Sequence, residues 1–436
     1  MNTTPSLDPA ALDAAQYLAH AEKLAAFAPQ FPATGRAFKQ AAVLGAGTMG
    51  RGIAMCLANA GIAVALIDNN AAALENAARI IEDTYAASTR KGKITAARAD
   101  AARQQIRTAT DLAAAARADV VIEAVFEDLP LKQQIFTALS AIVAPGCLLA
   151  SNTSFLDIDK IAQAVQDPAR MVGLHFFSPA HIMPLVEVVQ SEHSSNAALA
   201  DAMALVRTLG KQPVAMRACD GFVGNRMLSR RTVEAESLLL HGASPQEVDA
   251  VLTAFGFPMG PFAMTDMAGV DVNWRTRQAR GLPLAIADAV YAAGRLGQKT
   301  GQGYYRYEDG SRKPLPDPAV TDIIDTIAQA QGIVRAPMAP ASMFERLVYP
   351  MINEGMRILE EGIVPRASDI DVVWRYGYGW PAESVGPMRY ADQIGLGVVS
   401  VALARMAKQT GRQTLAPAPL LLRLAGEGAS VVRAFA

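Results

Sequence analysis

A glycine-rich turn between an apolar run and a helix-forming segment constrains the fold of this chain more than any other feature. Residues 41–44 are apolar, residues 45–50 read G-A-G-T-M-G, and a helical pattern follows over 48–60. In such a turn the first glycine lets the chain bend sharply, the second lets the backbone approach a pyrophosphate, and the third lets helix and strand pack closely. The helix N-terminus then offers unpaired N–H groups and a positive dipole end to phosphates. The pattern predicts a dinucleotide site that includes Gly45, Gly47, Thr48, Met49 and Gly50.

The segments around this turn alternate between short apolar runs and longer helical patterns. Strand candidates are 41–44, 63–67, 120–125, 147–150 and 213–218, and helices are expected over 48–60, 70–89 and 131–143. This alternation predicts a parallel, doubly wound sheet, a Rossmann-type α/β domain, over 38–218. Before it, residues 1–37 are expected to form a helix over 8–27 and a linker. The boundary residues expected for that helix are Ser6 or Asp8 at its start and Pro29 and Pro32 at its end.

An acidic residue stands where a dinucleotide fold places one. Asp68 follows the apolar run 63–67 and lies eighteen residues after Gly50. A carboxylate there accepts hydrogen bonds from ribose hydroxyls and repels a 2′-phosphate, so NAD is favoured over NADP. Asn69 and Asn70 add no cation that could neutralise such a phosphate. The alternative is that Asp68 only caps the helix that follows.

Two later stretches of helical pattern share the spacing of their distinctive residues. Glu234 precedes Gly242 by eight residues, and Glu354 precedes Gly362 by eight. The tripeptides G-F-P and G-W-P, a Gly-Pro pair and an Asp-x-x-Gly pair then recur in the same order. Shared spacing of this length indicates an internal repeat. We therefore expect two copies of one helical unit at 221–308 and 343–434, forming tandem all-α domains at 219–310 and 340–436.

The composition excludes several classes of function. The 436 residues carry a formal net charge of −1 and no basic block, which argues against nucleic acid binding. No run of 18 apolar residues predicts a membrane span, and residues 1–37 lack the pattern of a secretory signal. The three cysteines, Cys56, Cys147 and Cys219, are far apart and show no metal-ligand spacing. We therefore expect no metal site and a reducing, cytoplasmic compartment.

One of the five histidines lies in an apolar, strand-like run. His175 is flanked by Leu174 and Phe176, and twelve residues later Glu187 lies in the run L-V-E-V-V. A carboxylate inside a buried strand is costly unless a partner satisfies it. Two adjacent strands joined by a six- or seven-residue turn would bring the two side chains together. The pair could then act as a general base for a hydroxyl, with the carboxylate fixing the tautomer of the imidazole. On spacing alone, the more ordinary interpretation is a core histidine satisfied by a structural glutamate.

Three further runs identify a family resemblance. They read A-S-N-T-S-F-L-D-I at 150–158, G-L-H-F-F-S-P at 173–179 and D-G-F-V-G-N-R at 220–226. In this order they resemble the signatures of the 3-hydroxyacyl-CoA dehydrogenase family, over residues 39–436. The chain is most similar to the dehydrogenase half of bifunctional or multifunctional β-oxidation enzymes, which also carries two helical domains. The resemblance implies NAD-dependent oxidation of the 3-hydroxyl group of an acyl-CoA thioester.

The resemblance also implies roles for individual residues. His175 is the expected catalytic base and Glu187 its orienting partner, while Ser154 and Asn225 are expected to contact the reacting oxygen and the thioester end of the substrate. The residues expected near the nicotinamide end of the cofactor are Glu127, Lys132 and Asn152. Those expected near the CoA nucleotide are Arg90, Lys91 and Lys93. For Glu127 and Lys132 the alternative is a pair that caps a helix start, and for the basic cluster it is a solvated helix end.

The chain departs from its long relatives in ways that set further expectations. Only residues 1–37 stand in place of the crotonase-type hydratase domain of those enzymes, so no enoyl-CoA hydratase activity is expected from this chain. A separate hydratase is then a possible partner. Pro184 replaces the basic residue that relatives usually carry before the strand of Glu187. Since single-copy relatives resemble dimers built through the helical domain, the second copy is expected to cover the first and make the chain a monomer.

Two other functions remain open at this point. One is a β-hydroxyacid or sugar-acid dehydrogenase that does not use CoA, although the lysine base of such enzymes has no convincing match between Ser154 and Asn225. The other is a catalytically silent NAD-binding subunit that docks on a separate hydratase. The complete set of Ser154, His175, Glu187 and Asn225 argues against this second alternative.

Overall fold

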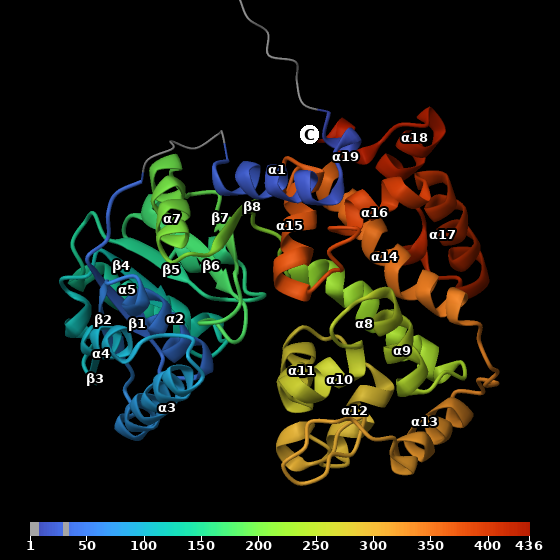
Figure 1. The fold of residues 1–436 in the computed structure, drawn as a ribbon, viewed down its shortest axis with the longest axis horizontal. Coiled ribbons are helices and arrows are strands. Elements are labelled where there is room, and N and C mark those ends of the chain that lie inside the picture. The colour runs from blue at the N-terminus through green and yellow to red at the C-terminus, as the bar shows by residue number, and fades with distance from the viewer. Residues whose placement is uncertain (1–7, 29–34) are drawn as a thin grey trace, which may run out of the picture. The chain divides into compact units, whose positions relative to one another are not determined.

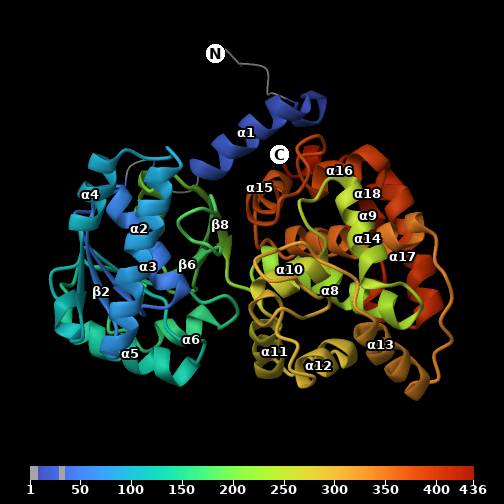
Figure 2. The same ribbon diagram turned by 60° about the horizontal axis from the view of Figure 1, so that its bottom comes forward.

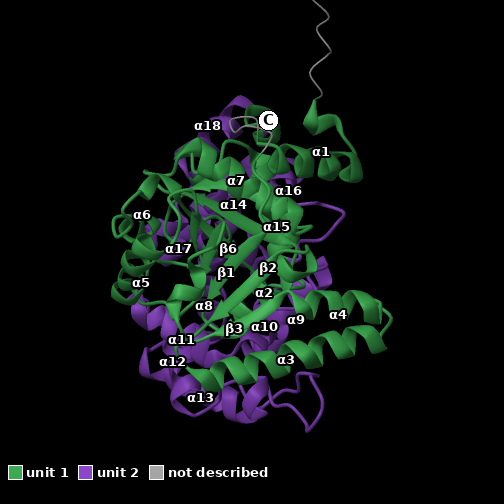
Figure 3. Cartoon of the chain, turned by 90° about the vertical axis from the view of Figure 1, so that its left-hand side faces the viewer, with its two compact units in different colours: residues 1–225, 358–378, 431–436 green, residues 226–357, 379–430 purple. Residues whose placement is uncertain are grey.

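A computed structural model describes residues 8–28 and 35–436 of the chain. These residues form two compact units, coloured separately in Figure 3. Unit 1 contains the described residues up to 225 together with 358–378 and 431–436, and unit 2 contains residues 226–357 and 379–430. The units therefore do not follow chain order, because part of the second helical copy belongs with the N-terminal unit.

Unit 1 is built on one sheet of eight strands, with the order β3-β2-β1-β4-β5-β6-β7-β8. Neighbouring strands run parallel except β6 and β7, which are antiparallel. The strands are β1 Gln40–Leu44, β2 Ala63–Ile67, β3 Ile106–Ala109, β4 Val120–Glu123, β5 Leu148–Ser151, β6 Met171–Phe176, β7 Leu185–Gln190 and β8 Gln212–Arg217. The predicted Rossmann-type α/β fold is therefore confirmed, with one antiparallel pair in an otherwise parallel sheet.

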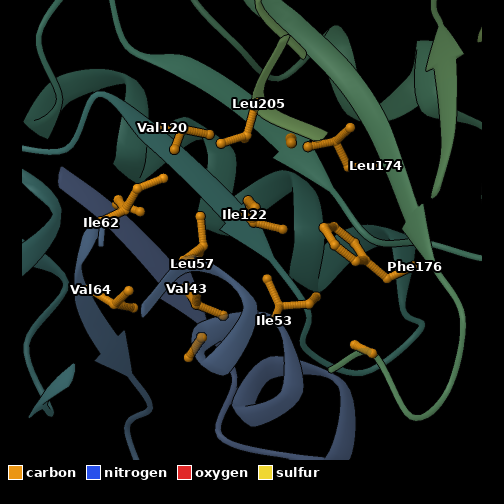
Figure 4. Close-up of a cluster of buried hydrophobic side chains, with 14 of the residues drawn as sticks. Val43, Ile53, Leu57, Ile62, Val64, Val120, Ile122, Leu174, Phe176 and Leu205 are labelled. Carbon is orange, nitrogen blue, oxygen red and sulfur yellow. The ribbon is translucent and has the colours of Figure 1, made fainter. Parts of the chain in front are cut away.

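Helices cover both faces of this sheet, as Figures 1 and 2 show. The helices of unit 1 are η1 Pro9–Ala11, α1 Ala14–Ala26, α2 Thr48–Asn59, α3 Ala71–Arg90, α4 Ala96–Gln104, η2 Leu112–Ala115, α5 Leu129–Ile142, α6 Ile158–Ala162, η3 Pro168–Arg170, α7 Asn196–Thr208, α15 Ala367–Tyr378 and α19 Val431–Ala434. On one face, side chains of α2 and α7 pack with alternate residues of β1, β4 and β6 in a single hydrophobic cluster (Figure 4). Because strand side chains alternate between faces, Leu174 and Phe176 in this cluster direct His175 to the opposite face.

Most predicted boundaries agree with the structure to within two residues, and the exceptions have local causes. The strand expected over 120–125 ends at Glu123, two residues early, because Glu123 turns its carboxylate back onto the N–H of Val125. Strand β3, of sequence I-R-T-A, was not predicted at all. It is an edge strand with no apolar run, so it depends on pairing with β2 for its conformation.

The helix predicted over 8–27 is shorter in the structure. Pro9–Ala11 forms one 3-10 turn, and α1 spans Ala14–Ala26. Asp13 caps α1 through a capping box with the residue three positions on, which satisfies two N–H groups of the first turn. The predicted start at Asp8 was therefore wrong, since Asp8 caps only the preceding 3-10 turn. The other predicted boundary residues lie outside the described residues: Ser6, Pro29 and Pro32.

Unit 2 is helical and follows the sequence repeat. Its elements are α8 Gly224–Leu240, α9 Pro245–Phe255, α10 Pro261–Ala268, α11 Val270–Ala279, α12 Ala285–Ala292, η4 Gln298–Thr300, α13 Pro318–Ala330, α14 Pro340–Glu360, α16 Pro387–Ile394, α17 Leu396–Thr410, η5 Gln413–Leu415 and α18 Pro419–Glu427, although the first two residues of α8 and the last three of α14 belong to unit 1. A helical region thus follows the Rossmann-type domain in the chain, as predicted. None of the described helices is long and apolar enough to cross a membrane.

The first helices of the two copies exchange ion pairs reciprocally. Arg226 on α8 contacts Glu354 on α14 at 2.7 Å, and Arg346 on α14 contacts Glu234 on α8 at 3.2 Å. Each arginine lies eight residues before the glutamate of its own copy. Contacts in which residue i meets j and j meets i are those of a two-fold pair. The two copies therefore meet through the same surface, as the subunits of a symmetric dimer would.

A buried aspartate in each copy accepts a hydrogen bond from a tyrosine, but the two tyrosines come from different parts of the chain. In the first copy Tyr305 donates its hydroxyl to Asp249 at 2.8 Å. In the second copy Asp371, on α15, accepts from Tyr17 on α1 at 2.7 Å. Helix α1 therefore supplies to the second copy a contact that the first copy makes with its own C-terminal segment.

Candidate active site

The glycine-rich turn lies between the C-terminal ends of β1 and β4, where the strand order reverses. A Cβ on Gly45 would lie 2.6 Å from the carbonyl oxygen of Ala124, and one on Gly50 would lie 1.7 Å from that of Gly45. Gly45 also has a φ of 95°, which disfavours any other residue. At Gly47 a Cβ would meet nothing within 4 Å, so the backbone there faces open space. These three positions match the requirements of a turn that admits a pyrophosphate.

Helix α2 begins directly after this open space. Gly47 is its N-cap and provides no side-chain hydrogen bond to the first turn, which includes Thr48 and Met49. The first N–H groups of the helix therefore retain their capacity to bind an anion. The residues present thus fit the diphosphate of a dinucleotide.

Asp68 lies beside this turn, at the end of β2. Its carboxylate accepts one hydrogen bond from the N–H of Ala46, at 2.8 Å, and one from the N–H of Asn70, at 2.9 Å. The cap of helix α3 is Asn70, whose side chain accepts from the first turn. Asp68 is therefore not the cap of α3, and it remains half-buried next to the turn with lone pairs for ribose hydroxyls.

His175 and Glu187 face each other across the antiparallel strands β6 and β7, where they are direct register partners. The Nδ1 atom of His175 donates to the Oε2 atom of Glu187 at 2.6 Å. The imidazole is 5% exposed and the carboxylate is fully buried. The connecting loop has eight residues, 177–184, so the predicted turn of six or seven was slightly too short. The hydrogen bond leaves the lone pair of Nε2 available to a substrate.

The second oxygen of Glu187 is held by the start of helix α8. The N–H of Gly224 donates to Oε1 at 2.9 Å. The turn before α8 places this group with two consecutive left-handed residues, Gly221 with a φ of 75° and Phe222 with a φ of 51°. The ring of Phe222 then packs against the imidazole of His175, with the ring centroids 5.7 Å apart. This partner of Glu187 was not predicted, because a backbone N–H leaves no mark in the sequence.

Ser154 completes a line of three side chains. Its hydroxyl oxygen lies 3.1 Å from Nε2 of His175, on the opposite side of the ring from Glu187. The segment that follows β5 is fixed by Glu127, whose Oε1 atom accepts from the N–H of Ser154 at 2.6 Å and from the hydroxyl of Thr153 at 2.7 Å. The sequence prediction thus named three residues that the fold brings together.

A buried ion pair supports this segment. Lys132 is 1% exposed and contacts Glu123, which is fully buried, at 2.6 Å and Glu127 at 3.3 Å. The hydroxyl of Ser151 donates to the other oxygen of Glu123 at 2.6 Å. Lys132 therefore does not cap a helix start, since Asp128 caps α5. Glu123 was missed in the sequence, although an acid inside the apolar run 120–125 is a recognisable signal.

The remaining predicted residues divide into two groups. The Oδ1 atom of Asn152 accepts from the N–H of Phe176 at 2.8 Å, which links β5 to β6 beside His175. Asn225, in the first turn of α8, accepts a hydrogen bond from the hydroxyl of Tyr378 at 2.9 Å. The others lie exposed at the end of α3 and in the turn after it, without a hydrogen bond to the residues above: Arg90, Lys91 and Lys93.

Among the described residues, no histidine other than His175 pairs with a carboxylate. His181 is half-buried, and burial together with the charges of Lys211 and Arg51 lowers its pKa below the usual value. The Nδ1 atom of His241 faces the carbonyl of Ser237 at 2.7 Å. The same residues, 8–28 and 35–436, contain no cluster of His, Cys, Asp and Glu able to hold a metal ion.

Comparison with known protein families assigns most of the chain to the two domains of one family. Residues 40–219 match the family described as 3-hydroxyacyl-CoA dehydrogenase, NAD binding domain. The C-terminal domain of the same family matches twice, at residues 221–307 and 343–432.

Curated relatives share this similarity over most of the chain. A peroxisomal bifunctional enzyme from Danio rerio is 38% identical over 418 residues, which cover 91% of this chain and 58% of the relative. The fatty acid oxidation complex subunit alpha of Pseudomonas savastanoi is 36% identical over 412 residues, covering 92% of this chain and 56% of the relative. The chain thus spans little more than half the length of these relatives.

Solved structures agree with the sequence comparison. A 3-hydroxybutyryl-CoA dehydrogenase from Escherichia coli superimposes with a TM-score of 0.78 at 28% identity, covering 90% of this chain and 99% of the other. The dehydrogenase part of multifunctional enzyme 1 from C. elegans gives 0.66 at 30% identity, covering 89% and 90%. Since the two domains of this family match nearly the whole chain, the chain belongs to the 3-hydroxyacyl-CoA dehydrogenase family.

Proposed function

We propose that this chain catalyses the reversible, NAD-dependent oxidation of (S)-3-hydroxyacyl-CoA to 3-ketoacyl-CoA. The observation that carries the proposal is that His175 contacts Ser154 with one ring nitrogen and Glu187 with the other. The glycine-rich turn follows another strand of the same sheet. Strands β1, β4, β5 and β6 run parallel, so their C-terminal ends meet at one edge. In open α/β sheets this edge is where ligands bind.

The proposed role of His175 is to take the proton of the 3-hydroxyl group on Nε2. When bound, NAD supplies the nicotinamide carbon that accepts the hydride from C3 of the substrate. Glu187 holds the Nδ1–H of His175, which keeps Nε2 unprotonated before the reaction and stabilises the positive ring afterwards. Because both oxygens of Glu187 accept hydrogen bonds, its carboxylate cannot turn away from the ring.

Ser154 and Asn225 are the proposed contacts to the substrate oxygens. The hydroxyl of Ser154 already lies at 3.1 Å from Nε2, so it can donate to the same oxygen that gives its proton to His175. The amide of Asn225 has two N–H donors, which can hold the thioester carbonyl and so position C3 beside His175. Glu127, Lys132 and Asn152 are proposed to line the nicotinamide end of the cofactor site through the hydrogen bonds described above.

The proposed preference for NAD over NADP rests on Asp68. Its carboxylate is directed to the glycine-rich turn by the N–H of Ala46, and no cation contacts it among the described residues. A 2′-phosphate beside this carboxylate would suffer electrostatic repulsion.

Turnover of acetoacetyl-CoA with NADH tests the proposal. We expect loss of NADH absorbance that depends on acetoacetyl-CoA, and only slow turnover of free acetoacetate, since binding energy from the CoA portion is used to position the reacting carbons. Equal turnover of the free acid would favour a β-hydroxyacid dehydrogenase that does not use CoA. Binding of NADH without turnover of either compound would favour the silent subunit. Extending the series to 3-ketohexanoyl- and 3-ketodecanoyl-CoA defines the preferred acyl length.

We further propose that the chain is a monomer and that a separate enoyl-CoA hydratase supplies its substrate. The reciprocal pairs Arg226–Glu354 and Arg346–Glu234 support the first point, because the second copy occupies the surface that a partner subunit would use. Hydration of a 2-enoyl thioester places a hydroxyl at C3, which supports the second. Light scattering is expected to give 46.1 kDa, and a stable dimer of twice that mass would contradict the monomer. The same measurement on a mixture with a hydratase tests for a complex.

A further inference from the structure

The hydroxyl of Tyr378 reaches the proposed substrate residue Asn225 from a distant part of the chain. Tyr378 is the last residue of α15, in the second helical copy, and donates to Oδ1 of Asn225 at 2.9 Å. The two residues are 153 positions apart, and both belong to unit 1. Helix α15 packs on β8 and on β7, the strand that carries Glu187 (Figure 1).

The ring of Tyr378 is fixed on several sides. It stacks on Trp374, one helical turn earlier, with centroids 4.5 Å apart. It also packs edge-on against the ring of Phe177, with the ring centroids 5.5 Å apart. The centroid of the Phe177 ring in turn lies 4.7 Å from that of His175. A Cβ on Gly224 would lie 2.5 Å from the ring and the hydroxyl, so the helix start admits this tyrosine only because residue 224 has no side chain. The hydroxyl therefore occupies one place beside Asn225.

The internal repeat shows that packing alone does not require this hydroxyl. Tyr378 precedes Gly379 of the second copy, and the equivalent residue before Gly256 of the first copy is Phe255. Phe255 packs against Phe344 with centroids 4.9 Å apart. By its distance from Glu354, Phe344 takes the place of Gly224 in the repeat. Two phenyl rings, those of Phe255 and Phe344, thus fill the first location, whereas the location beside Asn225 has a glycine and a phenol.

The hydrogen bond to Oδ1 favours one of the two orientations of the Asn225 amide, because a phenol donates its proton more strongly than its oxygen accepts one. An asparagine amide has an oxygen that only accepts and a nitrogen that only donates. With Oδ1 turned to the hydroxyl of Tyr378, the Nδ2 donors of Asn225 are directed away from it, toward other partners. Without the hydroxyl the amide can rotate by half a turn and present its oxygen to the thioester carbonyl, where two acceptors would repel each other.

We infer that Tyr378 is a positioning residue, which holds the amide of Asn225 in the orientation that donates to the substrate carbonyl. The inference rests on the proposed function, because it assumes that Asn225 contacts the thioester. It gives the second helical copy a role in the reaction, since this copy supplies the hydroxyl that orients a substrate contact of the first.

The variant Tyr378→Phe tests the inference, because phenylalanine keeps the contacts with Trp374 and Phe177 and removes only the hydroxyl. We expect kcat with acetoacetyl-CoA to fall about 10-fold, less than the roughly 10²–10³-fold cost of removing a donor itself. NADH affinity and the thermal midpoint should stay near those of the parent protein. Tyr376→Phe is the matched control, since Tyr376 lies on the same helix and donates to Glu22 instead.

A double-mutant cycle separates positioning from a structural effect. In the Asn225→Ala background, Tyr378→Phe should change kcat by less than about twofold, because the group on which Tyr378 acts is gone. Full additivity of the two losses, or wild-type kcat in Tyr378→Phe alone, would overturn the inference.

The same cycle on acetoacetyl-CoA binding, measured by calorimetry without NADH, does not need turnover. A parent protein that binds this thioester but does not reduce it would contradict the proposed function. A loss of affinity in Tyr378→Phe that vanishes in the Asn225→Ala background would then still support the inference. An unchanged affinity in both backgrounds would contradict it.

Discussion

Replacing His175 with alanine is expected to lower kcat for acetoacetyl-CoA reduction by about 10²–10⁴-fold, the usual contribution of a positioned acid or base. In this direction the imidazole must give a proton to the forming hydroxyl, and no other described residue is held at the same place by Ser154 and Glu187. The glycine-rich turn and Asp68 do not depend on the imidazole, so NADH affinity should be retained. Stopped-flow or steady-state assays together with NADH fluorescence titration measure both quantities.

The control for this variant is His193→Ala. His193 is exposed and lies in the turn after β7, where the carboxylate near it is that of Asp159 and not that of Glu187, so its loss should leave kcat unchanged. If His175→Ala kept the rate of the parent protein, His175 would not be the base. If it lost NADH binding as well, the loss of rate would report damage to the fold rather than to the chemistry.

Replacing Glu187 with glutamine is expected to lower kcat by about 10²–10⁴-fold while leaving the protein folded. Glutamine has nearly the same shape, but one of its two terminal groups is a donor. That donor must face either the N–H of Gly224 or Nδ1 of His175. The N–H of Gly224 is part of the backbone and cannot become an acceptor, whereas an imidazole can move its proton to the other nitrogen. The amide NH₂ should therefore face His175, and its proton should then lie on Nε2, the atom that must be free to act as base.

The readouts for Glu187→Gln distinguish this explanation from simple destabilisation. Both hydrogen bonds survive in the rearranged form, so the thermal midpoint should fall far less than in Glu187→Ala, which leaves the buried N–H of Gly224 without a partner. Glu192→Gln, five residues further along and exposed, is the control. Retention of the parental kcat in Glu187→Gln would mean that the carboxylate only supports the fold.

Local patterns in the sequence were sufficient for the elements that carry the site. The glycine-rich turn, the strands β1 and β2, and the candidate pair His175 and Glu187 follow from apolar runs, glycine spacing and the cost of an acid inside a buried strand. Each of these signals lies within about twenty residues, and over such short stretches the periodicity of apolar residues indicates the secondary structure. The helical repeat was visible because its glycine, proline and acidic residues recur at nearly constant spacing.

The elements and residues that were missed had either a competing local signal or a partner in another element of the fold. Strand β3 has no apolar run of its own and exists because β2 offers it a free edge. The start of α1 is set by the capping box at Asp13, which competes with the equally plausible cap at Asp8. Glu123 could have been recognised as an unusual acid at the end of a strand, but its partner Lys132 comes from the following helix.

The sequence by itself indicated a dinucleotide-binding α/β domain, a repeated helical region and the candidate pair His175 and Glu187, because spacing and burial cost act over short stretches. Only the tertiary structure decided how these groups are held: Ser154 at Nε2, the N–H of Gly224 at Glu187, and Tyr378 at Asn225. Such contacts join residues from 21 to 153 positions apart. They arise from sheet order and from the packing of α15 on β7 and β8, which no local pattern encodes.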